Sequence, residues 1–129
     1  MTPEWQLWFE FAKRDLGSCR KLLEGKFYAN ACYHAQQAVE KALKGLLLYR
    51  GKTVIKTHSL PELFVLLEEA ALASHRDAID VLNKYYIPIR YPDLIEGAEP
   101  SWFSDENEAR NALALAREVA EAVFAIVKK

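Results

Sequence analysis

Apolar side chains recur at steps of three and four residues along most of the chain, and this periodicity restricts the fold more than any other feature of the sequence. Near the start, one such stripe runs through Trp5, Trp8, Phe9, Ala12, Leu16, Cys19 and Leu23. These steps place side chains on one face of an α-helix, whereas a half-buried strand alternates every two residues. No segment alternates at that shorter period, so we expect an all-α protein.

Residues that begin and end helices divide this pattern into four to five helices. The signals are a Thr2-Pro3 start, Gly25 and Gly51 as ends, and the capping-box sequence SLPE at residues 59–62. Their short connections predict an up-and-down antiparallel helical bundle. The expected helices cover residues 3–24, 27–50, 60–73, 77–86, and 104 or 105 to 129.

The second predicted helix carries small and large side chains on neighbouring faces. Small side chains let another helix approach closely, so this seam is expected to pack, either within the bundle or across a dimer. The seam consists of Ala31, Ala35, Ala38, Ala42 and Gly45. His34 and Lys41 lie at its edge on a helical wheel, and four further polar residues are expected farther round, toward water: Tyr33, Gln37, Glu40 and Lys44.

Composition and length predict a single domain over residues 1–129. The chain is 51% hydrophobic and 27% charged, as in ordinary globular proteins, and its net charge of −1 argues against indiscriminate binding to nucleic acid or anionic membrane. No apolar run is long enough for a membrane span and the N-terminus lacks a signal-peptide pattern, so we expect a cytoplasmic location without membrane association. In that compartment Cys19 and Cys32 are expected to be buried thiols, and their similar distances from Gly25 allow them to face each other across the first turn.

Charge is distributed unevenly along the chain. Residues 41–58 contain five Lys or Arg and no acid, whereas residues 93–108 contain six acids and no Lys or Arg. Three interpretations follow: the two regions lie on different solvated faces, the basic stretch attracts an anionic ligand, or the two regions meet within or between subunits.

The segment around Arg90 is the strongest candidate site. Pro88 and Pro92 stiffen the backbone on either side of Arg90, so ordering this segment on binding costs less entropy than ordering a flexible loop. A guanidinium offers a planar fork to phosphate, and nearby phenol rings offer faces to a base and hydroxyls to a sugar. The alternative is structural, with Arg90 paired to a carboxylate and the tyrosines closing the end of the bundle. Trp102 and Phe103 are expected to cap the core or to anchor a partner.

Other catalytic patterns are absent from the sequence. There is no phosphate-binding glycine loop, HExxH, CxxC or GxSxG motif. The three histidines, His34, His58 and His75, fall on different predicted elements, so no metal site or cofactor is expected.

The sequence resembles the HEPN domain family, and specifically the stand-alone prokaryotic group often found beside minimal nucleotidyltransferases. The resemblance rests on four motifs in order: AKRDL, HAQQAVEKALKGLL, THSL and RYPD. It implies a helical bundle that forms a homodimer. It also implies binding of a nucleotide or other phosphorylated ligand, or partnership with a nucleotidyltransferase in a toxin–antitoxin-like pair.

Many members of this family are metal-independent RNases that use an Arg followed four to six residues later by a His. Arg90 has no such partner, because no His follows His75, and between Arg50 and His58 there are seven residues. RNA cleavage is therefore not favoured, and no catalytic residue is assigned. Carried onto this chain, the resemblance implies a ligand site made of Arg90, Tyr91, Asp93, Tyr85, Tyr86 and Lys41. An RNase with an atypical site and a purely structural interaction module remain the alternatives.

Overall fold

A computed structural model describes residues 1–86 and 104–128 of the chain. Within these residues it contains helices and no strands, so the predicted all-α bundle is confirmed. The helices are α1 (Glu4–Glu24), α2 (Tyr28–Tyr49), α3 (Leu60–Leu67), α4 (Arg76–Asn83) and α6 (Glu106–Val127), with a 3₁₀ turn, η1 (Ala70–His75), before α4. In the described part of the chain, no helix combines the length and apolar character that crossing a bilayer requires.

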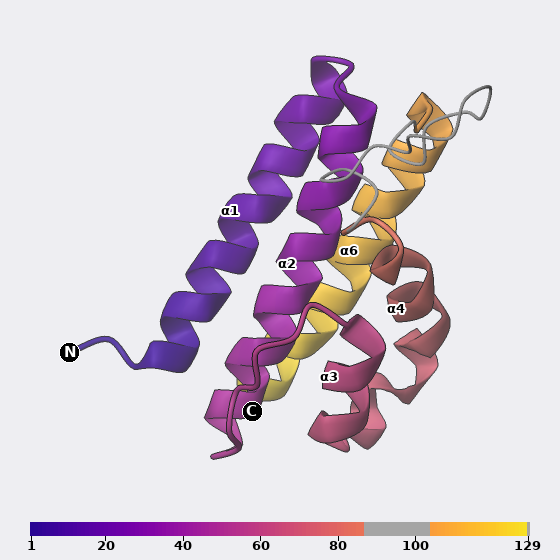
Figure 1. Cartoon of the computed structure of the whole chain (residues 1–129). Helices are drawn as coiled ribbons and strands as arrows, with labels where there is room; N and C mark the ends of the chain where they lie inside the picture. Colours follow the sequence, from indigo (N-terminus) through magenta and orange to yellow (C-terminus); the bar gives the residue numbers. More distant parts are fainter. Residues whose placement is uncertain (87–103, 129) are drawn as a thin grey trace.

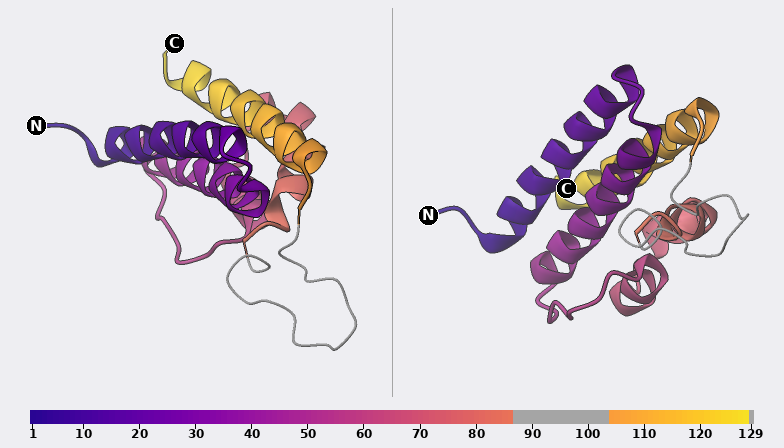
Figure 2. Two further views of the ribbon diagram at one scale, coloured as in Figure 1. Left: turned by 90° about the horizontal axis from the view of Figure 1, so that it is seen from above. Right: turned by 45° about the horizontal axis from the view of Figure 1, so that its top comes forward.

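The three long helices α1, α2 and α6 run side by side, and α3 and α4 cover the flank of α2 and α6 away from α1 (Figures 1 and 2). Helix α2 therefore lies in the centre and contacts every other α-helix. Its apolar face forms the core with side chains that are fully buried, among them Leu43, Leu46, Leu63, Ile79, Leu82 and Val119.

The predicted helix starts at residues 59 and 105 are confirmed by side-chain caps. The Ser59 hydroxyl accepts a hydrogen bond from the Glu62 N–H (3.3 Å), and the Asp105 carboxylate accepts one from the Glu108 N–H (2.8 Å). Glu62 does not complete the capping box, because its carboxylate accepts a hydrogen bond from the Thr57 hydroxyl (2.8 Å). Both caps satisfy N–H groups that have no partner within the helix.

Gly51 ends α2 as predicted, in the left-handed conformation (φ +74°). The first turn differs in detail, since Gly25 has an ordinary φ of −81° and Lys26 adopts the left-handed one (φ 68°). The Lys26 N–H donates to the Leu23 carbonyl and the Phe27 N–H donates to the Leu22 carbonyl. This pair of bonds is a Schellman motif, which satisfies the last carbonyls of α1.

The prediction of one continuous third helix was wrong. Helix α3 ends at Leu67, Glu68 is left-handed (φ 53°), and η1 follows. The reason is tertiary, because the Lys52 ammonium donates hydrogen bonds to the carbonyls of Leu66 (2.8 Å) and Leu67 (2.9 Å). A cation from the preceding loop thus caps the C-terminal end of α3, where the helix dipole favours positive charge.

The seam of small residues packs within the bundle. All its members are buried, and a Cβ atom on Gly45 would lie 2.7 Å from the Phe9 ring and 3.0 Å from the Trp5 carbonyl oxygen. Helix α1 therefore approaches α2 more closely at Gly45 than any larger residue allows. Of the two interpretations left open by the sequence, packing within the chain is the one observed.

Cys19 and Cys32 are buried thiols, as expected. Burial raises the pKa of Cys19 to about 12, and the neighbouring Cys32 adds to that shift. Burial likewise raises the pKa of Cys32 to about 11. Both side chains act as small apolar groups between α1 and α2.

Candidate functional site

The predicted ligand residues fall into two groups. Arg90, Tyr91 and Asp93 lie outside the described residues, as do Trp102 and Phe103. Tyr85, Tyr86 and Lys41 lie within the described residues, in three different environments.

Tyr85 has a structural position. It is 7% exposed, and its hydroxyl donates a hydrogen bond to a Glu108 carboxylate oxygen on α6 (3.0 Å). Burial raises the pKa of Tyr85, and the charges of Cys32 and Glu108 raise it further, so the phenol stays protonated. Tyr85 ties the end of α4 to α6 and does not join Tyr86 at the surface.

Tyr86 belongs to an aromatic stack. Its ring lies nearly parallel to that of His58, with centroids 4.1 Å apart and planes inclined by 17°. Tyr33 on α2 lies on the same stack, with its centroid 6.2 Å from that of Tyr86. We call Tyr33, His58 and Tyr86 the aromatic stack. It brings together side chains from α2, from the loop before α3 and from the segment just after α4. Its last member is four residues before Arg90 in the sequence.

His58 is held by a buried carboxylate. Its Nδ1 lies 3.1 and 3.2 Å from the two carboxylate oxygens of Glu40, while its side chain remains 52% exposed. Because a carboxylate only accepts hydrogen bonds, Nδ1 is the ring nitrogen that carries the proton. Nε2 makes no hydrogen bond with any residue that the structure describes.

Glu40 is the centre of a buried polar cluster. It accepts hydrogen bonds from Lys44 (3.1 Å) and Gln36 (3.3 Å), and the Gln36 amide also donates to the His58 carbonyl (3.1 Å). The side chains of Glu40 and Lys44 are only 5% and 8% exposed. We call this group, together with His58, the Glu40 cluster.

The prediction that Glu40 and Lys44 face water was therefore wrong. The Trp8 ring of α1 covers Lys44, whose ammonium lies 5.7 Å from the ring centroid, and His58 covers Glu40 from the loop. The spacing of four residues on one helix favours their ion pair. Nothing in that spacing indicates burial, because burial depends on what lies opposite the helix.

Lys41 lies in a second polar group, the Asp15 cluster. The Asp15 carboxylate on α1 accepts from Lys41 (2.6 Å) and pairs with His34 Nδ1 (2.8 Å). The Asp15 side chain is 9% exposed, whereas Lys41 and His34 are 27% and 32% exposed. Asp15 therefore holds two cationic or cation-forming groups at the surface, and a ligand anion would compete with it for Lys41.

Most of the basic stretch at 41–58 is engaged within the bundle. Arg50 pairs with Glu69, Lys52 caps α3, and Lys41 and Lys44 pair with the two clusters. None of these partners belongs to the acidic stretch at 93–108, whose Glu106 and Glu108 contact Arg110 and Tyr85 instead. Among described residues, the two charged stretches do not pair with each other.

The described ranges, 1–86 and 104–128, hold no group of three or more His, Cys, Asp or Glu that would bind a metal ion. The arrangement suits a different chemistry. A flat aromatic stack can receive a planar base, and a cation beside it would bind an attached phosphate. An imidazole whose Nδ1 is fixed by a carboxylate can also accept a proton at Nε2.

Comparison with known proteins places this chain among helical proteins of similar length. The HEPN domain profile matches residues 5–127. The crystal structure of TT1696 from Thermus thermophilus has a TM-score of 0.85 at 39% identity, over 95% of this chain and 98% of that one. The crystal structure of ST0689, an archaeal HEPN homologue, has a TM-score of 0.79 at 29% identity, over 98% and 99% of the two chains.

One matching protein has a name that refers to a function. "Putative toxin MJ1304" of Methanocaldococcus jannaschii is 29% identical over 97 residues, which are 68% of this chain. The match spans 63% of the length of that relative.

Proposed function

The chain belongs to the HEPN domain family, and on that basis we propose that it binds a nucleotide or another phosphorylated ligand as the partner subunit of a minimal nucleotidyltransferase. The observation that carries the proposal is the stack of Tyr33, His58 and Tyr86, whose last member is four residues before Arg90 in the sequence. The toxin name of the relative supports a toxin–antitoxin-like pairing.

Each part of the ligand has a complementary group in this proposal. A base stacks on the aromatic side chains, which every base can do because each has a π-face. Arg90 binds the phosphate with its planar fork, and Asp93 orients Arg90 or accepts a ribose hydroxyl. Tyr91 adds a ring or a hydroxyl, and Lys41 adds positive charge. Tyr85 supports the site from the core and makes no contact with the ligand.

Replacing Arg90 with Ala tests this function. We expect the affinity for ATP or GTP, measured by calorimetric titration, to fall by about tenfold or more, because a charge-assisted hydrogen bond contributes about 1.5–3 kcal/mol. The melting temperature should stay within a few degrees of the original. Tyr86→Ala should weaken binding by about 1–3 kcal/mol through the lost stack.

Arg76→Ala is the matched control, since Arg76 is an exposed arginine on α4 without an ion pair among the described residues. It should leave the affinity unchanged. If Arg90→Ala instead lowers stability strongly and binding is unaffected, Arg90 is a structural residue. If the protein binds a nucleotidyltransferase but no nucleotide at millimolar concentration, it is an interaction module.

A second function, metal-independent RNA cleavage at an atypical site, is favoured by one observation. His58 is half exposed and its Nδ1 is fixed by Glu40, as in a general base oriented by a carboxylate. Arg50 and His58 are held by different carboxylates, Glu69 and Glu40, so they do not form the Arg–His pair of typical family members. Cleavage of RNA in the presence of a chelator, lost in both His58→Ala and Arg90→Ala, would establish this function in place of the first.

We further propose that the protein is a homodimer, as the family resemblance implies, and that α1 contributes to the interface. Leu7 and Phe11 are 45% and 48% exposed on one face of α1. With Glu4 and Trp8 they line an apolar depression of about 300 Å³. Trp8 also covers Lys44 of the Glu40 cluster.

The double variant Leu7→Lys/Phe11→Lys should convert a dimer into a monomer, because each change places a charge in an apolar interface. Light scattering coupled to gel filtration measures the mass directly. Val65→Lys on α3, where the wild-type side chain is 68% exposed, is the control and should leave the mass unchanged. If the double variant still has the mass of a dimer, the interface does not involve this face of α1.

A further inference from the structure

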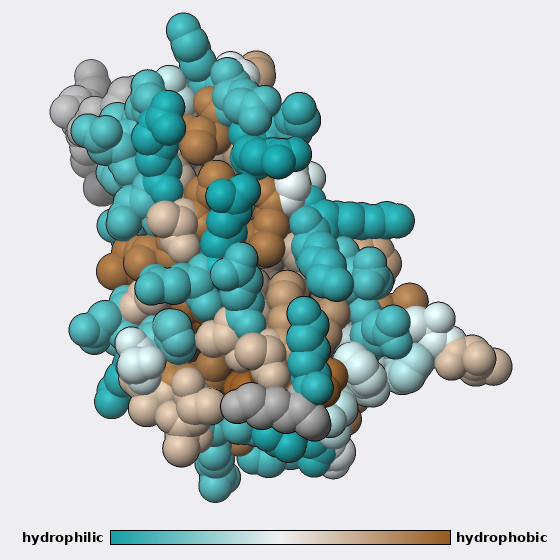
Figure 3. Space-filling view, turned by 180° about the vertical axis from the view of Figure 1, so that it is seen from behind, coloured by the Kyte–Doolittle hydropathy of each residue, from teal (hydrophilic) through white to brown (hydrophobic). Residues whose placement is uncertain are grey.

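We propose that the furrow between α1 and α6 is a second ligand site, which takes a small phosphorylated molecule with a planar apolar part between the facing arginines Arg20 and Arg117. The furrow lies on the face seen from behind in Figure 3, where hydrophilic side chains flank a hydrophobic strip. It contains none of the residues assigned to the ligand site above.

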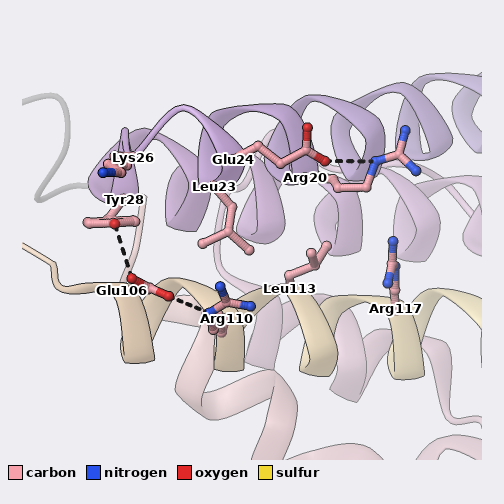
Figure 4. Close-up of a pocket in the computed structure, with 9 residues that line it drawn as sticks. All are labelled: Arg20, Leu23, Glu24, Lys26, Tyr28, Glu106, Arg110, Leu113 and Arg117. Carbon is pink, nitrogen blue, oxygen red and sulfur yellow. Dashed lines mark hydrogen bonds and ion pairs between the residues drawn. The ribbon is translucent and has the colours of Figure 1, made fainter.

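The furrow has the size and the layered lining of a small-molecule site. Its volume is about 450 Å³, within the range of about 300–1,000 Å³ that ligand pockets occupy. Figure 4 shows three zones along it: Tyr28 with Glu106 and Arg110 at one end, Leu23 facing Leu113 in the middle, and Arg20 with Arg117 at the other end.

Positive charge exceeds negative charge in this furrow. Its lining includes four cations, Arg20, Lys26, Arg110 and Arg117, but only two carboxylates, Glu24 and Glu106. The excess is present at both ends of the furrow (Figure 4). Lys26 and Arg110 outnumber Glu106 near Tyr28, where Arg110 is paired with Glu106 at 2.7 Å, and Arg20 and Arg117 outnumber Glu24 at the other end.

The two arginines at the opposite end are poorly compensated. Arg20 lies 4.0 Å from Glu24, which is also shared with Lys21 at 3.6 Å. Arg117 makes no ion pair with any residue in the described ranges, and its guanidinium points toward α1 (Figure 4). Its charge also opposes the rise in the pKa of Cys19, a buried residue of α1. Two guanidinium groups from opposite walls can each bind a phosphate through two hydrogen bonds.

The remainder of the furrow suits the planar part of the ligand. Leu113 is only 7% exposed and forms an apolar floor with Leu23. The Tyr28 hydroxyl donates to Glu106 (3.3 Å), which fixes the ring at the far end. A nucleoside monophosphate has the required chemistry: a charged phosphate for the arginines and a flat base for the leucines and the tyrosine. A free phosphate would use only one end.

The test uses the Arg90→Ala protein, so that the first site does not contribute and its failure is separate from failure of the furrow. AMP is the probe, and amide chemical shifts of α1 and α6 report where it binds. We expect AMP to shift the amides around Leu23 and Leu113, and Arg20→Gln/Arg117→Gln to weaken this binding by about tenfold or more. Arg14→Gln, which removes an exposed arginine of α1 outside the furrow, should have no effect.

Three outcomes would overturn the proposal. The first is that AMP leaves the α1 and α6 amides unshifted, and the second is that the double variant binds AMP as well as its parent does. The third is that inorganic phosphate or adenosine alone binds as tightly as AMP, which would show that the arginines and the apolar floor do not act on one ligand. Preferential binding of an RNA oligonucleotide across the furrow would assign it to a nucleic acid instead.

Discussion

Replacing Glu40 with Ala is expected to lower the free energy of unfolding by about 3–5 kcal/mol, because it leaves a buried ammonium without its counter-charge. The Lys44 side chain is 8% exposed, and Glu40 is its carboxylate partner. The Trp8 ring, 5.7 Å from the ammonium, contributes much less than an ion pair. Gln36 and His58 also lose an acceptor, so within this cluster only the hydrogen bond from the Gln36 amide to the His58 carbonyl still ties the loop before α3 to α2.

Urea denaturation measures this loss, with Glu118→Ala on the exposed face of α6 as the control, which should change stability by less than about 0.5 kcal/mol. The double variant Glu40→Met/Lys44→Met should recover most of the loss, since apolar side chains of similar size need no counter-charge. A loss below about 1 kcal/mol in Glu40→Ala would mean that Lys44 moves into water, and that the Glu40 cluster does not hold the loop.

Gly45→Ala is the second substitution with a large expected effect, a loss of about 1–3 kcal/mol. Elsewhere in a helix this change stabilises by about 1 kcal/mol, because Ala has the higher helix propensity. At Gly45 the added Cβ would lie 2.7 Å from the buried ring of Phe9 and 3.0 Å from the Trp5 carbonyl oxygen. The ring has little room to move and the backbone has less, so α1 must shift away from α2.

Gly17→Ala on α1 is the matched control. An added Cβ there meets no atom within 4 Å, so the thermal midpoint should rise. A gain of stability in Gly17→Ala and a loss in Gly45→Ala would show that contact between α1 and α2, and not helix propensity, determines the stability change at Gly45. A rise at both positions would mean that the two helices are farther apart than described.

Local signals in the sequence were sufficient for the helices whose ends are set locally. Ser59 and Asp105 cap their helices with their own side chains, and Gly51 takes the left-handed turn, so each end could be recognised from a few neighbouring residues. The seam followed from the same kind of reasoning, because small residues at helical spacing indicate close approach. The seam did not indicate which helix would pack against it.

The features that were missed depend on residues distant in sequence. The break at Glu68 follows the capping of α3 by Lys52, and the burial of Glu40 and Lys44 requires Trp8 from α1 and His58 from the loop. A helical wheel describes one helix without its neighbours, and it therefore assigns polar residues to water.

The candidate site was predicted in part. Both Tyr85 and Tyr86 were named as candidate site residues, yet adjacent residues point in different directions, and only Tyr86 reaches the aromatic stack. The role of His58 was not recognised, because its partner Glu40 lies 18 residues earlier on another helix. The assignment of Arg90, Tyr91 and Asp93 stays a prediction.

The two cysteines between α1 and α2 have a practical consequence for labelling. Thiolates, not thiols, react with maleimides, and pKa values of about 12 for Cys19 and about 11 for Cys32 keep both side chains protonated near neutral pH. We therefore expect the two cysteines of the folded protein to react very little with maleimides. A single cysteine engineered at an exposed position can carry a spin label or a fluorophore without any prior removal of the natural ones.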